Sequence, residues 1–92
     1  MRNGLITSSR GSKRWYQNNQ LHRTDGPAVE YAEGDKFWYH NGLLHRIDGP
    51  AVEYENGNKH WYINGVQYDF NNWLELVDFT EPQKTVMRLQ YA

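Results

Sequence analysis

The chain has 92 residues, a net charge of −1 and no cysteine. This length allows one small domain, and the lack of cysteine excludes disulfides, thiolate metal sites and a cysteine nucleophile. Acidic and basic residues are interspersed, so we expect neither a nucleic-acid-binding stripe nor a nucleic-acid mimic. No apolar run reaches the length of about 18 residues that a membrane span needs, and the amino end opens no secretory signal. We therefore expect a cytoplasmic protein.

The amino end matches half of a unit that follows it. Gly11 and Lys13 lie 23 positions before Gly34 and Lys36. An outermost unit has no neighbour to cover it, so terminal units of repeat arrays are atypical. Residues 1–14 are therefore predicted to form a degenerate half repeat that caps the array.

One phrase of 23 residues then occurs twice in succession. Trp15, Trp38 and Trp61 are spaced by 38 − 15 = 23 and 61 − 38 = 23 residues, and each precedes a tyrosine. Residues 15–37 and 38–60 are identical at 15 of 23 positions. A fixed period of about 20–50 residues indicates a repeat architecture, in which each unit buries its apolar face against the next.

Turn residues separate the predicted strands. Asn56-Gly57 stands between two β-prone runs, and Asn-Gly is the strongest short signal for a hairpin. Asn41-Gly42 and Asn64-Gly65 predict a second turn after each Trp-Tyr pair, and Asn18-Asn19 fills this place in the first unit. Asp48-Gly49-Pro50 predicts a third turn, with proline at the start of a strand because it cannot donate a ladder hydrogen bond. The result is an antiparallel meander with strands near residues 5–8, 13–17, 20–22, 28–33, 36–40, 43–45, 51–55, 59–63 and 66–68.

Four Trp, seven Tyr and three Phe suit a sheet whose faces are covered by rings. Side chains alternate across a strand, so each Trp faces away from the Tyr that follows it. We expect Trp15, Trp38 and Trp61 to form the buried column together with Val29 and Val52. The tyrosines would then be partly exposed.

After Tyr68 the period ends and two helices are predicted. Asp69 is a suitable N-cap for a helix over residues 70–78. An apolar stripe at helical spacing is expected to pack onto the sheet, with a dimer or partner interface as the alternative. The stripe consists of Phe70, Trp73, Leu74 and Val77.

Thr80-Glu81-Pro82-Gln83 resembles a capping box with proline in the first turn. It predicts a second helix over residues 81–90, with Val86, Met87 and Leu89 on its apolar side. A strand over residues 86–91 is the alternative, because that segment also alternates.

The sequence thus predicts a single domain over residues 1–92. Its fold class is mostly β: an antiparallel meander of 23-residue hairpin repeats, capped by one or two C-terminal helices. The half repeat covers residues 1–14, the hairpin repeats cover 15–68, and the helical cap covers 69–92.

The repeated phrase is similar to a known family. Its pattern is Trp-Tyr-x-Asn-Gly-x-Leu-His-Arg-x-Asp-Gly-Pro-Ala, completed by Gly-x-Lys. This pattern resembles the short β-hairpin repeats related to MORN repeats, which occur in small bacteriophage proteins and in giant-virus proteins. The resemblance covers residues 1–68 and is specific over 15–65.

The resemblance implies a MORN-like hairpin array that acts as an elongated binding surface and is not itself an enzyme. It implies a phage-encoded protein that works in the host cytoplasm, where it binds a host protein and inhibits a host defence factor. The His-Arg-x-Asp-Gly-Pro segment departs from eukaryotic MORN units, so lipid binding is not carried over.

His22, Arg23 and Asp25 form a local cluster that recurs as His45, Arg46 and Asp48. Zinc needs three or four converging donors, and each cluster supplies two. We expect a structural role, in which arginine and aspartate pair across the turn and histidine caps nearby backbone groups. Partner contact is the second interpretation. Metal binding or catalysis is the third interpretation. The cluster occurs twice, and an active site is normally built once.

Two further patterns have a functional and a structural interpretation. Tyr16, Tyr39 and Tyr62 recur at the same period and could stack the bases of a single strand. Cross-strand ring packing is the structural interpretation, and nearby acidic residues offset the lysines and arginines. Glu30 and Glu53 could form a glycosidase pair only if about 5–9 Å separated their carboxyl groups, and no second element builds a pocket.

The leading hypothesis is a non-enzymatic protein-binding module without catalytic residues, metal or cofactor, whose partner is a host protein. The alternative is a nucleic-acid-binding protein that uses two sets of recurring residues. One is the Tyr column, and the other is the Arg/Lys column of Arg23, Arg46, Lys13, Lys36 and Lys59. We expect a monomer or homodimer without membrane association. The candidate partner-binding residues are Tyr16, Tyr39, Tyr62, His22, His45, Arg23 and Arg46.

Overall fold

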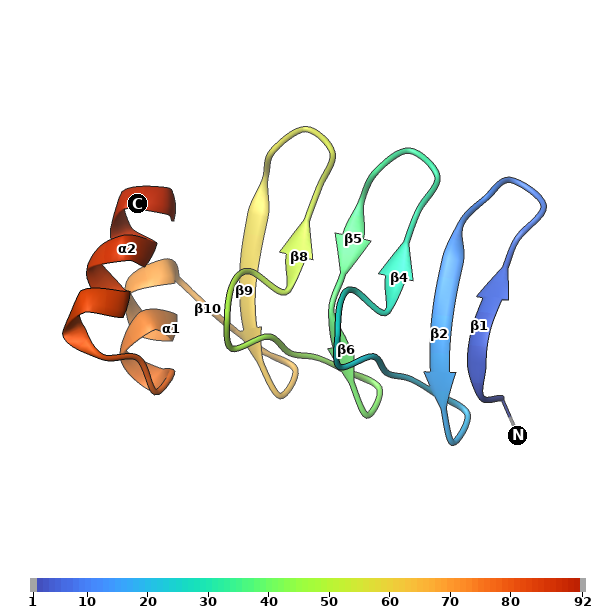
Figure 1. Ribbon diagram of the computed structural model, residues 1–92, viewed down its shortest axis with the longest axis horizontal. Coiled ribbons are helices and arrows are strands. Elements are labelled where there is room, and N and C mark those ends of the chain that lie inside the picture. The colour runs from blue at the N-terminus through green and yellow to red at the C-terminus, as the bar shows by residue number, and fades with distance from the viewer. Residues whose placement is uncertain (1, 92) are drawn as a thin grey trace.

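The computed structural model describes residues 2–91 as a row of antiparallel strands followed by two helices (Figure 1). The principal extents are 42 × 28 × 19 Å, and the helices lie at the opposite end of the long axis from the first strand. The strands are β1 (Gly4–Thr7), β2 (Lys13–Gln17), β3 (Gln20–Leu21), β4 (Val29–Glu30), β5 (Lys36–Phe37), β6 (Tyr39–His40), β7 (Leu43–Leu44), β8 (Val52–Glu53), β9 (Lys59–Ile63) and β10 (Val66–Tyr68).

One antiparallel sheet has the strand order β1-β2-β4-β5-β8-β9-β10, with β3 paired to β2, and β6 and β7 pair with each other. This arrangement confirms the predicted meander. Three hairpins within it have the same register, because residues aligned across each hairpin are eight positions apart in the sequence. The aligned pairs are Ile6 with Arg14, Val29 with Phe37, and Val52 with His60.

The Asn-rich turns form as predicted. Asn41 and Gly42 both have positive φ, as do Asn64 and Gly65. Two successive residues with positive φ are the signature of a tight hairpin turn that matches the strand twist. Asn18-Asn19 adopts the same backbone without a glycine, with φ of 51° and 67°.

Hydrogen bonds join each hairpin to the next. The Trp15 N–H donates to the Ala28 carbonyl and the Trp38 N–H to the Ala51 carbonyl, both at 2.8 Å. Ala28 and Ala51 are fully buried, and the Asp-Gly-Pro segment directly before each of them reverses the chain into the next hairpin. These segments therefore set the spacing between neighbouring hairpins.

The prediction that the tryptophans share a buried face with Val29 and Val52 is wrong. β2 and β4 align Arg14 with Val29, so these two side chains lie on one face, and the next residue, Trp15, lies on the other. Val29 and Val52 are both 3% exposed, whereas among the three tryptophans of the repeated phrase only Trp61 is buried. Rings occur on both faces in the sequence, and only the strand pairing decides which residues share a face.

We name the two faces by their aromatic residues. The Tyr face carries Arg14, Val29, Tyr31, Phe37, Val52, Tyr54 and His60. The Trp face carries Lys13, Trp15, Glu30, Lys36, Glu53, Lys59 and Trp61.

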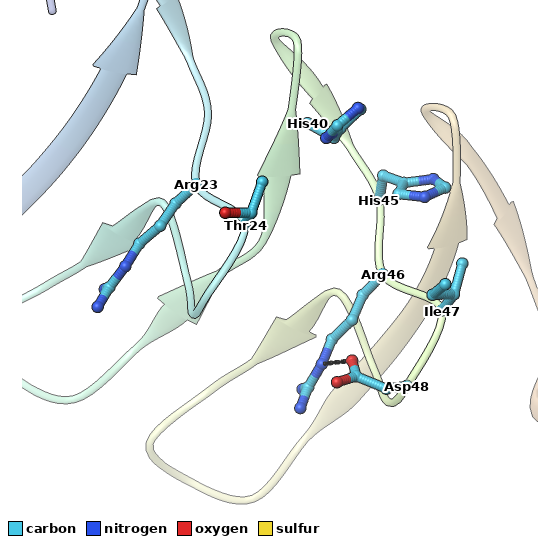
Figure 2. Close-up of a pocket in the computed structure, with 7 residues that line it drawn as sticks. All are labelled: Arg23, Thr24, His40, His45, Arg46, Ile47 and Asp48. Carbon is cyan, nitrogen blue, oxygen red and sulfur yellow. Dashed lines mark hydrogen bonds and ion pairs between the residues drawn. The ribbon is translucent and has the colours of Figure 1, made fainter. Parts of the chain in front are cut away.

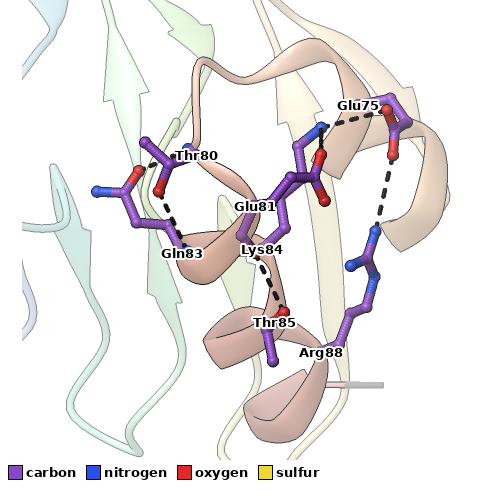
Figure 3. Close-up of polar contacts among 7 residues, drawn as sticks. All are labelled: Glu75, Thr80, Glu81, Gln83, Lys84, Thr85 and Arg88. Carbon is purple, nitrogen blue, oxygen red and sulfur yellow. Dashed lines mark hydrogen bonds and ion pairs between the residues drawn. The ribbon is translucent and has the colours of Figure 1, made fainter.

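The two predicted helices are confirmed as α1 (Phe70–Leu76) and α2 (Glu81–Tyr91). Asp69 caps α1, because its carboxylate accepts the Asn72 N–H at 2.8 Å. The capping box of α2 is present: Thr80 N–H donates to Gln83 Oε1, and Gln83 N–H donates to Thr80 Oγ1 (Figure 3). The strand alternative for residues 86–91 is wrong.

The helices close the C-terminal end of the sheet around Trp61. The buried core there consists of Trp61, Trp73, Leu74, Val77 and Met87, so the stripe of α1 packs onto the sheet as predicted. The apolar side predicted for α2 is partly wrong, since Val86 and Leu89 are 59% and 84% exposed. The capping box fixes the start of α2 so that Met87 faces the core.

Salt bridges tie the two helices together at the surface. Lys84 Nζ lies 3.3 Å from Glu75 on α1 and 3.7 Å from Glu81 in its own helix, and Arg88 also reaches Glu75 (Figure 3). No helix within residues 2–91 is long and apolar enough to cross a membrane.

Candidate binding surface

The Arg46 side chain occupies the centre of the second His-Arg-x-Asp-Gly-Pro segment. Its guanidinium carbon lies 3.9 Å from the centroid of the Trp38 ring. Nε donates to Asp48 Oδ1 at 2.8 Å, and Nη1 donates to the Pro50 carbonyl at 2.9 Å. Glu53 Oε1 lies 3.7 Å from the same Nη1. The predicted Arg–Asp pair is therefore present, and Trp38 adds a cation–π contact to it.

The glycine that follows each aspartate lies close to the arginine guanidinium. A Cβ at Gly49 would lie 2.7 Å from Arg46 Cζ, and a Cβ at Gly26 would lie 3.0 Å from Arg23 Cζ. A Cβ at Gly49 would therefore force the guanidinium to shift, and one at Gly26 would crowd it. The Asp-Gly-Pro segment thus leaves room for the arginine at the same point where it turns the chain.

Arg23 makes the corresponding contacts 23 positions earlier. Its guanidinium carbon lies 3.8 Å from the Trp15 ring centroid, and Nε donates to Asp25 Oδ1 at 2.8 Å. Nη1 donates to the Pro27 carbonyl at 3.1 Å and lies 3.7 Å from Glu30 Oε2. Both candidate arginines are thus held by carboxylates of their own segments.

The two candidate histidines each bind the turn of the next hairpin. Nδ1 of His22 accepts the Asn41 N–H, and Nδ1 of His45 accepts the Asn64 N–H, both at 3.0 Å. Each imidazole must therefore carry its proton on Nε2. Burial lowers the pKa of both histidines below the usual value, and the neighbouring His40 lowers the pKa further. The backbone capping expected of these residues is present.

Asn3 takes the place of histidine at the first turn. Its Oδ1 accepts the Asn18 N–H at 2.8 Å, and the Arg2 carbonyl accepts the Asn19 N–H at 2.9 Å. The turns at residues 18–19, 41–42 and 64–65 therefore each have a side-chain acceptor from the preceding segment. An amide oxygen cannot be protonated in the way that an imidazole can.

An open groove of about 410 Å³ separates the two arginine segments (Figure 2). Both of its arginines already bind carboxylates, so the groove offers little free positive charge. In Figure 2 the arginine side chains extend away from the histidine end of the groove, which leaves no convergent set of groups. The lining residues are Arg23, Thr24, His40, His45, Arg46, Ile47 and Asp48.

The candidate tyrosines Tyr16, Tyr39 and Tyr62 are all half-buried. The Arg2 guanidinium lies 5.3 Å from the Tyr16 ring centroid. Burial raises the pKa of Tyr39, and the phenols of Tyr31 and Tyr62 raise it further. These rings therefore pack against other parts of the sheet over part of their surface.

A longer row of rings on the Tyr face was not expected from the sequence. Arg14 lies over Tyr31, with 5.4 Å from Cζ to the ring centroid. Tyr31, Phe37, Tyr54 and His60 then follow edge to face, with centroid distances of 5.6, 5.9 and 5.7 Å. Tyr31 and Tyr54 share one place in the repeated phrase, and Phe37 and His60 share another. Strand pairing brings these two places together. We call this set the aromatic row.

The Trp face instead carries alternating charges across the strands. Successive pairings align Lys13 with Glu30, Glu30 with Lys36, Lys36 with Glu53, and Glu53 with Lys59. Cross-strand neighbours of opposite charge stabilise a sheet modestly. The face therefore has no block of one sign.

The arrangement of Glu30 and Glu53 does not favour glycoside hydrolysis. Lys36 lies between them in the sheet, so two strand spacings, about 9–10 Å, separate their backbones. Arg23 and Arg46 each hold one of the two carboxylates. Within residues 2–91, no group of three or more His, Asp or Glu side chains is placed to hold a metal ion.

Comparison of the chain with protein-family models, with curated proteins and with solved structures found no match.

Proposed function

We propose that this chain is a non-enzymatic, MORN-like repeat protein that binds another protein through the Tyr face. In this proposal it is encoded by a bacteriophage, and its partner is a host protein that it inhibits. The phage origin and the host partner rest on the sequence resemblance. The use of the Tyr face rests on the aromatic row.

The repeat interpretation is supported by contacts that recur 23 positions apart. The hairpin register, the Trp-to-Ala backbone bonds, the Arg–Trp stacking and the His-to-Asn bonds each occur in both copies of the phrase. Conserved contacts at a fixed spacing are typical of arrays in which each unit touches its neighbours.

The aromatic row carries the proposal. It runs from the residue after β4 across β5 and the residue after β8 to β9, and its Tyr54 ring is 37% exposed. Tyrosine and arginine are enriched in protein interfaces and among the few residues that carry most of the binding energy there. A strip of rings that lies along the sheet suits a protein surface better than a small molecule, which needs an enclosed pocket.

The test is capture of a partner from bacterial lysate with a tagged full-length chain. We expect one protein at stoichiometric level, and we expect the double substitution Tyr31→Ala and Tyr54→Ala to abolish its capture. A matched control is Lys36→Gln with Lys59→Gln, which changes the Trp face and should leave capture intact. Capture that survives loss of both tyrosines would contradict the proposal, provided that melting curves show that the variant is folded.

Nucleic-acid binding along the Tyr and Arg/Lys columns is less well supported. Arg23 and Arg46 are paired with carboxylates, and the lysines of the Trp face alternate with glutamates. Nucleic-acid affinity depends on neutralised phosphates and falls steeply with salt. We expect no salt-dependent binding of oligonucleotides to these columns.

A further inference from the structure

The outer edge of β1 has no strand beside it within residues 2–91. β1 is the first strand in the sheet order and pairs only with β2 (Figure 1). Its four residues are all exposed, including Leu5 at 50% and Ile6 at 44%. The other end of the sheet, by contrast, is covered by α1 and α2.

The register shows which backbone groups of β1 face that free edge. Trp15, the partner of Leu5, uses its own N–H and C=O on its far side, to Ala28 and His22. Leu5 and Trp15 therefore form a non-hydrogen-bonded pair, and the N–H and C=O of Leu5 point away from β2. Alternation gives Thr7 the same orientation, whereas Ile6 is bonded to β2.

The free edge matches an edge that is filled elsewhere in the sheet. Leu5 lies 23 positions before Ala28 and 46 before Ala51, and those two alanines accept the Trp15 and Trp38 N–H groups at 2.8 Å. The Leu5 carbonyl is thus equivalent to the Ala28 and Ala51 carbonyls, each of which accepts a hydrogen bond from a neighbouring strand. An exposed edge in ladder geometry is a template for strand addition.

The first hairpin is also the basic end of the molecule. Residues 2–17 contain four cationic and no acidic side chains, which gives +4, so the rest of the chain carries −1 − 4 = −5. No salt bridge within the described chain joins any of the four to a carboxylate. The four are Arg2, Arg10, Lys13 and Arg14.

We propose that the β1 edge binds an extended acidic segment of a partner protein by strand addition. This inference rests on the proposed protein-binding function and adds a second contact site to it. The backbone of the segment would bond to Leu5 and Thr7, and its carboxylates would lie near the four cations of the first hairpin.

Charge argues against the other occupants of this edge. Pairing of β1 with β1 of a second copy would bring together two hairpins of +4 each, which repel. A nucleic acid would satisfy the cations, but its phosphates cannot complete a ladder that needs both donors and acceptors. An acidic peptide satisfies both requirements.

The test uses two labelled peptides with blocked ends, each of about eight residues, an ordinary strand length. One alternates Val with Glu and the other alternates Val with Lys. Fluorescence anisotropy with the full-length chain at low salt should give a Kd at least about tenfold lower for the Val-Glu peptide. Equal affinity for the two peptides, or no binding of either, overturns the proposal.

A matched pair of variants locates the site. Arg10→Glu with Lys13→Gln and Arg88→Glu with Lys59→Gln both change the net charge by −3. The first pair, in the first hairpin, should weaken Val-Glu peptide binding by about tenfold or more, whereas the second pair should change it less than about twofold. Equal effects of the two pairs would mean non-specific attraction and would overturn the proposal.

Amide hydrogen exchange reports the ladder itself. Bound Val-Glu peptide should slow exchange at Leu5 and Thr7, whose N–H groups face the free edge, and leave Ile6 unchanged. Binding without protection at Leu5 and Thr7 overturns the proposal. Two further outcomes overturn the proposal. One is that a single-stranded oligonucleotide displaces the labelled peptide more effectively than unlabelled Val-Glu peptide does. The other is that the chain self-associates through this edge.

The lysate experiment separates this proposal from the proposed function. If the captured protein is lost with Tyr31→Ala and Tyr54→Ala but retained with Arg10→Glu and Lys13→Gln, then strand addition fails and the Tyr-face function stands. If nothing is captured while the Val-Glu peptide binds as predicted, then the host-protein function fails and the edge site stands.

Discussion

The guanidinium of Arg46 lies over the Trp38 ring, with 3.9 Å between its carbon and the ring centroid. Trp15 has the same cover from Arg23 at 3.8 Å. Trp61 has no following arginine segment, and Phe70, Trp73 and Tyr91 surround it instead. Each tryptophan of the repeated phrase is therefore covered, and the C-terminal helices replace the arginine at the last one.

Gly49→Ala should destabilise the protein by about 1–3 kcal/mol, the usual cost of overpacking. The new Cβ would lie 2.7 Å from Arg46 Cζ, whose guanidinium also contacts Trp38 and Asp48. Gly26→Ala should cost less, because the corresponding distance to Arg23 Cζ is 3.0 Å and Gly26 is less buried. Urea denaturation measures the stability of both variants. Equal stability of Gly49→Ala and wild type would contradict the close contact between Gly49 and the Arg46 guanidinium.

Arg46→Lys should destabilise by about 1–2 kcal/mol although the charge is kept. A lysine cannot stack flat on Trp38 while it also bonds to Asp48 and the Pro50 carbonyl. Arg88→Lys is the control, since Arg88 makes one exposed ion pair at 3.8 Å. A similar denaturation midpoint for the two variants would contradict this role of Arg46.

Stability should fall as the pH drops below about 6.5, the value for histidine in the unfolded chain. Folding lowers the pKa of His22 and His45, so the unfolded state binds protons first and gains stability relative to the folded state. Above that pH both states are neutral and these groups add no pH dependence. A protonated Nδ1 can no longer accept the Asn41 or Asn64 N–H. The loss of each hydrogen bond costs about 0.5–1.5 kcal/mol of stability.

The double variant His22→Gln and His45→Gln should flatten this pH dependence, because a glutamine oxygen can accept the same N–H and does not titrate. His60→Gln is the control, since His60 contacts Gln67 and Tyr54 and bonds to neither turn. Melting temperatures from pH 5 to pH 8 provide the measurement. An unchanged slope in the double variant would assign the pH dependence to other groups.

Trp61→Ala should cost about 3–5 kcal/mol, more than Trp38→Ala. Trp61 is 7% exposed and packs among the helical rings, with Trp73 4.6 Å away between centroids. Trp38 is only half-buried beneath Arg46, so its removal leaves a smaller cavity. Thermal melting of both variants measures the order, and a larger loss for Trp38→Ala would reverse the assignment of the core.

The amino-acid sequence by itself determined the local structure. Asn-Gly and Asp-Gly-Pro fix backbone turns through the φ values that these residues favour, so the hairpins followed from a few positions. The caps of both helices were predictable for the same reason, because a cap joins residues only three apart: Asp69 to Asn72, and Thr80 to Gln83. The excess of positive charge in residues 2–17 is also visible in the sequence, and the expectation of interspersed charges was wrong for this segment.

Only the tertiary structure decided which residues meet across strands and which surfaces remain free. Alternation places Trp15 and Arg14 on opposite faces, but strand pairing alone puts Val29 beside Arg14 and joins Tyr31 to the aromatic row. The partners of Leu5 likewise depend on hydrogen bonds that Trp15 makes on its other side. Such contacts join residues on different strands, and local preferences of the chain do not fix their register.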